Sequence, residues 1–247
     1  MSTMLGAYGA LLRVEPGRCL ELVADVHAFL HSRSRPRVPN AMVAICGAVR
    51  GAALVDSGEH EEGIEELRVA RACADAIAAA TDVVAMVALL EHGAATAVGR
   101  HDVVRAVTGW AERVLGAGGE AALLRAHRLT GLGRDRAAAA ALAPVLDESA
   151  ATALPWAQIE AFLLDCRLAL RAERLPRARR SLARALELTA DTGALRPLAR
   201  APAEIVDLMV RHLGGLGALD PAAVRVLSAR QALGLDRHPV TLTARER

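Results

Sequence analysis

One spacing of small and large apolar residues recurs along the chain, and it constrains the fold more than any other feature. A small residue is followed twelve positions later by a second small residue, then by a large apolar residue at +4 and a small one at +7. Three copies are clear and one is weaker: Gly51, Leu54, Gly58, Gly63, Leu67, Ala70; Ala126, Leu129, Gly133, Ala138, Leu142, Val145; Cys166, Ala169, Ala178, Leu182, Ala185; and, weaker, Ala94, Ala97, Gly99, Ala106, Trp110. Small residues that face each other let two antiparallel helices pack closely. The pattern predicts antiparallel helical hairpins, with uneven spacing between copies.

Composition supports an all-α chain. Hydrophobic residues make up 53% of the sequence but aromatic residues only 2%, because alanine dominates. Alanine has the highest helix propensity, whereas the aromatic and β-branched residues that favour strands are sparse by comparison. Proline and glycine divide the chain into expected helices at 16–32, 40–56, 59–79, 81–98, 101–115, 119–131, 135–148, 155–172, 175–192, 195–213 and 221–233. The hairpins resemble tetratricopeptide (TPR) repeats, and we predict one TPR-like antiparallel helical-hairpin solenoid over residues 1–233.

The basic residues exclude two kinds of chemistry. All 30 Lys and Arg residues are arginines, as expected for a GC-rich genome, so the chain has neither the lysine of a phosphate-binding P-loop nor an amine for Schiff-base formation. The net charge is only +2, too small for a strong nucleic-acid footprint. We expect no cofactor.

Localisation follows from what the sequence contains. Acidic residues interrupt the most apolar stretch, and no run reaches the length of a membrane-spanning helix. The first residues lack the basic start of a signal peptide. The cysteines, which form no C-x-x-C pair, read as small buried hydrophobes in a reducing compartment: Cys19, Cys46, Cys73 and Cys166. The sequence predicts a cytoplasmic protein.

Few residues suggest a site. His27 and His31 have the i,i+4 spacing of a shared metal, but no third ligand is evident, so we predict no metal site. Acidic residues 59–66 read as a solvated face. The strongest basic patch spans Arg171–Arg184. A charge run is usually a solvated face, and the candidates for a partner-binding role within it are Arg177, Arg180 and Arg184. Trp110, Trp156 and Phe162 read as core residues, and no catalytic constellation can be assembled.

The last six residues point to function. Thr243 and Glu246 have the spacing of a capping box, which begins a helix. The string Leu242-Thr243-Ala244-Arg245-Glu246-Arg247 resembles the opening of the helix-turn-helix domain in LuxR-type transcriptional regulators, with Leu242, Thr243, Arg245 and Glu246 as the matching residues. The preceding helix and linker, and the Arg-Pro step at residues 196–197, resemble the same part of the large MalT-like members.

The resemblance implies different roles for three segments of the chain. Residues 1–233 would be the sensor and interaction domain, 234–241 a linker, and 242–247 the start of a truncated DNA-binding domain. Such arrays receive a protein partner or a small-molecule inducer and control homo-oligomerisation, and DNA would be bound only through the missing C-terminal domain. We therefore expect a regulatory region that is not an enzyme. A stand-alone TPR-like adaptor and an all-α enzyme are the alternatives.

Overall fold

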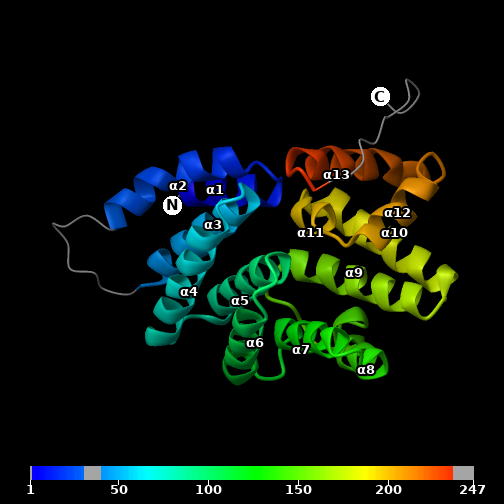
Figure 1. Ribbon diagram of the computed structural model, residues 1–247, viewed down its shortest axis with the longest axis horizontal. Coiled ribbons are helices and arrows are strands. Elements are labelled where there is room, and N and C mark those ends of the chain that lie inside the picture. The colour runs from blue at the N-terminus through cyan, green and yellow to red at the C-terminus, as the bar shows by residue number, and fades with distance from the viewer. Residues whose placement is uncertain (1, 31–39, 236–247) are drawn as a thin grey trace. The chain divides into compact units, whose positions relative to one another are not determined.

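The computed structural model describes residues 2–30 and 40–235, and every regular element within these ranges is helical (Figure 1). The elements are α1 (Ser2–Leu12), α2 (Pro16–Leu30), α3 (Ala41–Asp56), α4 (His60–Ala76), α5 (Thr81–Ala97), α6 (His101–Leu115), α7 (Gly119–Gly131), α8 (Asp135–Leu146), α9 (Pro155–Arg171), α10 (Leu175–Thr192), α11 (Arg196–Ala199), α12 (Ala203–His212), the 3-10 helix η1 (Gly217–Leu219) and α13 (Asp220–Ala232). The predicted all-α class is confirmed.

Two helix predictions are wrong. The chain folds into α1 before Pro16, where no helix was expected, because Ala7, Ala10 and Leu11 form an apolar face that is fully buried. The single helix expected over 195–213 is divided into α11 and α12 at Pro202. Proline lacks the amide that would continue the helical hydrogen bonds, and it excludes the preceding residue from helical geometry.

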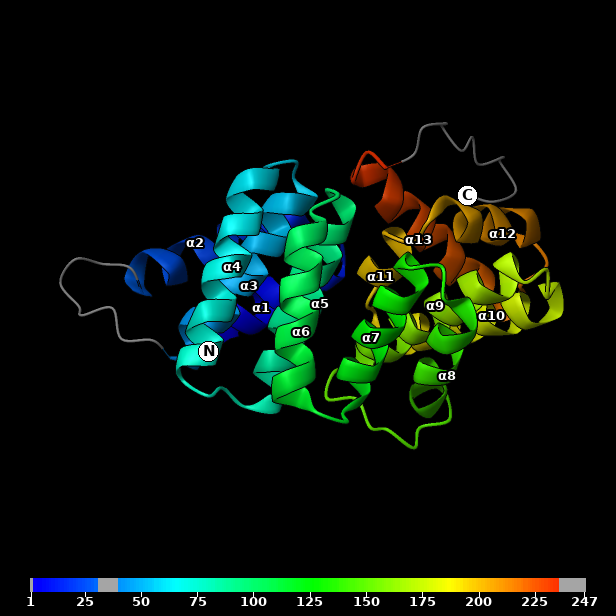
Figure 2. The same ribbon diagram turned by 60° about the horizontal axis from the view of Figure 1, so that its bottom comes forward.

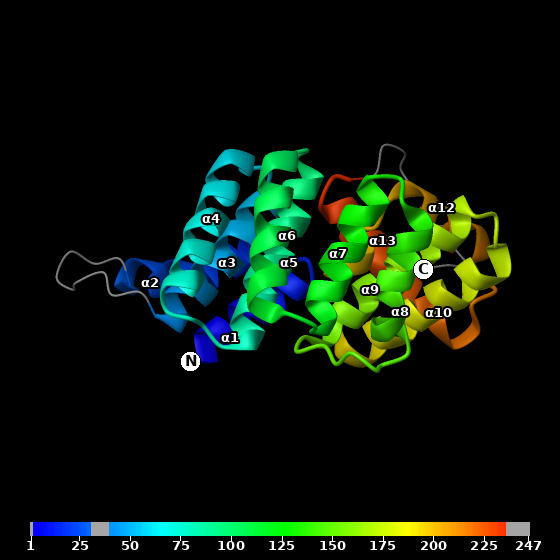
Figure 3. The same ribbon diagram turned by 90° about the horizontal axis from the view of Figure 1, so that it is seen from below.

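The described residues fall into two compact units. Unit 1 comprises the chain up to Leu11 together with Glu15–Leu154, and unit 2 comprises Leu12–Val14 together with the chain from Pro155. Within unit 1, α3 packs on α4, α5 on α6 and α7 on α8, and Figures 2 and 3 both show α3–α6 as neighbouring hairpins. Within unit 2, α9 packs on α10 to form a fourth hairpin, and α11, α12 and α13 follow it.

The same turn closes all four hairpins. Each turn contains one residue with positive φ: Gly58 (94°), Gly99 (75°), Gly133 (69°) and Glu173 (56°). In each case the amide of the following residue donates to a carbonyl five positions back, at 2.8–2.9 Å, as from Arg100 to Ala95. We call these four positions the turn residues. Their common geometry gives every hairpin the same reference point.

Counted from the turn residue, the small residues of the repeat lie seven positions before it and five after it. In the first hairpin these are Gly51 and Gly63. A Cβ atom at Gly51 would lie 2.8 Å from the carbonyl oxygen of Gly63, and one at Gly63 would lie 2.7 Å from the carbonyl oxygen of Gly51. Such distances are too short for any Cβ atom, so α3 and α4 approach as closely as two backbones can. Glycine is required at both positions.

The third and fourth hairpins use slightly larger residues in the same register. Ala126 and Ala138 in one, and Cys166 and Ala178 in the other, have no exposed surface. Most of the other repeat residues in the three clear copies are also buried: Leu54, Leu67, Ala70, Leu142, Val145, Ala169, Leu182 and Ala185, whereas Leu129 is partly exposed.

The second hairpin departs from the sequence pattern. Its turn residue Gly99 places His92 and Val104 at the two small positions. The weaker copy built on Ala94 and Ala106 is therefore shifted by two residues, and Ala106 is in fact exposed. The pattern misled here because a histidine and a valine occupy the positions where the other hairpins carry small side chains.

The turn residue Glu173 gives the first testable prediction. Left-handed backbone costs a residue with a Cβ roughly 1–2 kcal/mol, and the other three turn residues are glycines. Replacing Glu173→Gly should stabilise the chain by about 1 kcal/mol in urea unfolding, after the larger entropy of glycine in the unfolded chain is allowed for. Gly133→Ala is the matched control, since a Cβ there meets nothing within 4 Å. Gly133→Ala should lower the free energy of unfolding by a similar amount. If neither variant changes the free energy of unfolding, the turn residues are not strained.

Candidate functional site

The first helix of every hairpin carries a charged residue eight positions before the turn residue, next to the first small position. These four residues are Arg50, Glu91, Arg125 and Asp165, and their charges alternate along the chain. Because the neighbouring small residue brings the helices close together, the side chain at this position lies where it can reach an adjacent helix. We call these four residues the first-helix charges.

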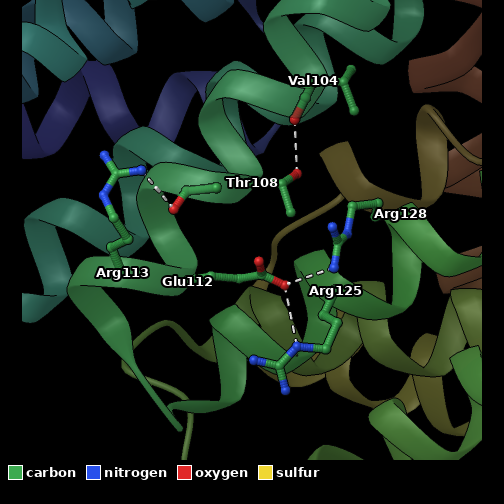
Figure 4. A network of polar contacts seen from close by, with 7 residues as sticks. Val104, Thr108, Glu112, Arg113, Arg125 and Arg128 are labelled. Carbon is green, nitrogen blue, oxygen red and sulfur yellow. Dashed lines mark hydrogen bonds and ion pairs between the residues drawn. The ribbon is translucent and has the colours of Figure 1, made fainter.

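Two of them join one hairpin to the preceding one. The Nε of Arg71 on α4 donates to the Oε2 of Glu91 on α5 at 2.8 Å. In the next hairpin the signs are exchanged: Glu112 on α6 accepts from the Nε of Arg125 on α7 at 3.2 Å, and from Arg128 at 3.4 Å (Figure 4). Arg71 and Glu112 both lie thirteen positions after their turn residues. The two contacts are therefore equivalent ion pairs of opposite polarity.

The other two are satisfied inside their own hairpins, again with exchanged signs. Arg50 on α3 donates to Glu62 at 2.6 Å and to Glu66 at 3.1 Å, both on α4. At the equivalent positions, Asp165 on α9 accepts from Arg177 at 2.6 and 3.2 Å, and from the hydroxyl of Ser181 at 2.6 Å.

This order of charges is selective. If the second hairpin were skipped, Arg125 would face Arg71. If Glu91 faced the equivalent position of its own second helix, it would meet Glu112. In both cases like charges would be in contact. Like charges in close contact are unfavourable, and a buried charge that loses its partner is strongly so. The Glu91 and Arg125 pairs, which are the two that join different hairpins, therefore favour one order of the first three hairpins.

Glu91 is the least satisfied of the four. It has no exposed surface, and its Oε1 has no hydrogen-bond partner among the described residues. Burial raises the pKa of Glu91 to about 7, although Arg71 and Arg68 oppose the shift. The hydrogen bond from Arg71 can form in either protonation state, but the ion pair is complete only above that pH.

The neighbouring His92 is shifted in the opposite direction. Burial lowers the pKa of His92 to about 4. Its ring lies 5.2 Å from that of His127 on α7, tilted by 46°. His92 thus contributes a neutral ring at the contact between α5 and α7, at the position where the other hairpins have a small residue.

The residues of the predicted partner patch have different environments. Arg177 is bound to Asp165, so it belongs to the hairpin contact rather than to a free surface. Arg184 pairs with Glu187 at 3.0 Å on the same helix. Arg180 is exposed.

The remaining candidates are the histidine pair, the C-terminal motif and the tryptophans. His27 lies 3.2 Å from Glu66, and no metal-binding group of three or more side chains occurs in residues 2–30 and 40–235. His31 and the motif residues Leu242, Thr243, Arg245 and Glu246 lie outside the described residues. Trp110 and Trp156 are buried, and Trp110 donates to Asp75 at 2.8 Å.

Three of the four cysteines are buried. Cys19, Cys46 and Cys166 are buried free thiols, and burial raises the pKa of Cys46 to about 11 and of Cys166 to about 12. Cys73 is partly exposed.

Over the described ranges, the structure contains no helix with both the length and the apolar character needed to cross a bilayer.

Sequence reasoning missed the first-helix charges, although a signal was present. In each clear repeat the residue immediately before the first small residue is charged: Arg50, Arg125 and Asp165. The repeat pattern was defined by apolar spacing alone, so the charged neighbour was not included.

Glu91 and His92 give a prediction for pH dependence. Because the pKa of Glu91 is raised on folding, its stability contribution is complete below pH 4.5 and is lost as the pH rises through about 7. Because the pKa of His92 is lowered, its contribution is complete above pH 6.5 and is lost as the pH falls through about 4. Between pH 4.5 and 6.5 the two effects have opposite signs and cancel.

Single substitutions should expose each effect in urea unfolding at several pH values. Relative to the wild type, Glu91→Gln should become more stable as the pH rises from 4.5 to 7, by up to about 1.4 kcal/mol per pH unit. His92→Gln should become less stable, relative to the wild type, as the pH rises from 4 to 6.5. A stability difference that is independent of pH in both variants would contradict the burial of these groups.

Comparison with protein families, with curated proteins and with solved structures found no match to this chain.

Proposed function

We propose that the chain is the helical-repeat regulatory region of a LuxR-type, MalT-like transcriptional regulator. In this proposal the hairpins stack as a TPR-like solenoid and bind a protein partner or a small-molecule inducer. Binding changes the stacking of the hairpins and so controls self-association and the exposure of a DNA-binding domain. We place the protein in the cytoplasm.

The observation that supports a binding role for the helices is structural repetition. Four hairpins share one turn geometry, and in unit 1 the first helices α3, α5 and α7 also contact one another in succession. Repeat proteins of this kind use the surfaces of stacked helices for binding, and small rotations between repeats change their curvature. The ion pairs of Glu91 and Arg125 lie at the contacts between successive hairpins, where such rotations take place.

The link to transcription comes from the motif Leu242–Arg247 and not from the described helices. A stand-alone adaptor built from the same hairpins is the second candidate, because the repetition by itself favours any protein-binding role.

The intact gene product distinguishes the two. We expect the reading frame beyond Arg247 to encode a helix-turn-helix, and the full product to bind DNA from its own upstream region in fluorescence anisotropy. Binding should weaken as salt is raised, because phosphate contacts release counterions. A stop codon directly after Arg247, or a full product that binds no DNA, would overturn the regulatory proposal and favour the adaptor.

A further inference from the structure

Three exposed arginines at the start of α10 form no ion pair with another described residue. Arg174 immediately precedes the helix, and Arg179 and Arg180 lie in its first two turns. Of the acids nearby, Asp165 is bound by Arg177 and Glu187 by Arg184, while the exposed Glu173 is adjacent to Arg174 in the turn. We call Arg174, Arg179 and Arg180 the free arginines of α10.

The position of Arg174, at the N-cap of α10, is unfavourable for the helix itself. The N-terminal end of a helix carries partial positive charge, so acidic side chains are stabilising there and basic ones are not. The first turn of α10 contains no acid, whereas the first turn of α4 contains Glu61 and Glu62. Residues that oppose the local preference of an element are expected where a function requires them.

Two of the three positions carry the opposite charge in unit 1. Counted from the turn residues Gly58 and Glu173, Glu59 and Glu65 correspond to Arg174 and Arg180, whereas the buried Ile64 corresponds to Arg179. The acidic side chains on this face are exposed, with Glu61 at 91% and Glu65 at 59%. The two outer helices share one scaffold and have opposite charges.

The asymmetry extends to the units as a whole. Among the described residues, unit 2 has thirteen arginines and eight acidic residues, whereas unit 1 has eleven arginines and eighteen acidic residues. A surface with the charge of unit 1 is therefore a complementary partner for the free arginines of α10, and every copy of the chain carries both.

We propose that the free arginines of α10 bind the acidic face at the start of α4, formed by the exposed Glu59, Glu61 and Glu65, in a second copy of the chain. The contact joins two different surfaces, so it is head-to-tail, and it continues into a ring or an open assembly. The proposal does not depend on the regulatory function above, because it follows from the charges of the hairpins.

The expected association is weak and sensitive to salt. Exposed ion pairs contribute little individually, and the acids of α4 must exchange partners, since Glu65 is bound by Arg68 and Glu61 lies 3.6 Å from Arg100. Charge complementarity chiefly sets the association rate and the choice of partner. Raising the ionic strength shortens the range of these interactions.

Sedimentation velocity of the full chain tests the proposal. We expect the weight-average sedimentation coefficient to rise with protein concentration at low salt, and this rise to disappear in 0.5 M NaCl. The variant R179E/R180E should remain monomeric at low salt. The control R134E/R136E makes the same charge change at the start of α8, where both arginines are also exposed, and it should associate like the wild type.

A mixing experiment separates a specific contact from a general charge effect. The variant E61R/E65R should also be monomeric alone, because its α4 and α10 are both basic. Mixed with R179E/R180E, it should associate again, since each basic helix then meets an acidic one. Circular dichroism confirms that each variant is folded. A monomeric wild type at all concentrations, unaltered association of R179E/R180E, loss of association in the control, or no recovery on mixing would each overturn the proposal.

Discussion

The close approach of two helices on either side of a left-handed turn determines where the other groups of each hairpin lie. At Gly51 and Gly63 the backbones are so close that a Cβ atom on either would collide with the opposite carbonyl oxygen. The adjacent first-helix charge is thereby held beside a neighbouring helix in every hairpin. Where the small position is filled by His92, the ring instead reaches His127 on α7, and Glu91 turns to Arg71 of the preceding hairpin. The packing thus fixes the positions of the charges, and the charges determine which helices can be neighbours.

The four charged contacts are not equal in their energetics. Asp165 is satisfied at both oxygens, by Arg177 and Ser181, whereas Glu91 is fully buried with one oxygen lacking a partner in the described part of the chain. A buried ion pair of this kind adds little net stability over an apolar pair, but it strongly disfavours arrangements that separate the charges. We therefore ascribe to the first-helix charges a role in selecting hairpin order rather than a large share of the stability. The raised pKa of Glu91 makes this one contact responsive to pH near neutrality.

The sequence predicted the helical class and the register of three of the four hairpins, because small residues at fixed spacing have a single physical explanation in packed helices. It failed where the determining feature is not residue size. His92 and Val104 are in register with the small positions but do not resemble them, and only the turn at Gly99 shows the equivalence. A pattern of residue spacing likewise does not predict which partner a charged side chain binds. Arg125 could have reached α8 of its own hairpin, yet it binds Glu112 on α6. Arg177 could have been a free surface charge, and its ion pair with the buried Asp165 depends on the tertiary fold.

A double-mutant cycle at Glu112 and Arg125 tests most directly whether charge order links successive hairpins. Both side chains are partly exposed, so reversal changes charge without overfilling a core. In an Arg128→Gln background, which leaves Glu112 one partner, Glu112→Arg and Arg125→Glu should each destabilise the chain in urea unfolding. Combining them should recover stability, with a coupling of about 0.5–1 kcal/mol. Additive effects, within about 0.3 kcal/mol, would contradict a selective contact between the hairpins.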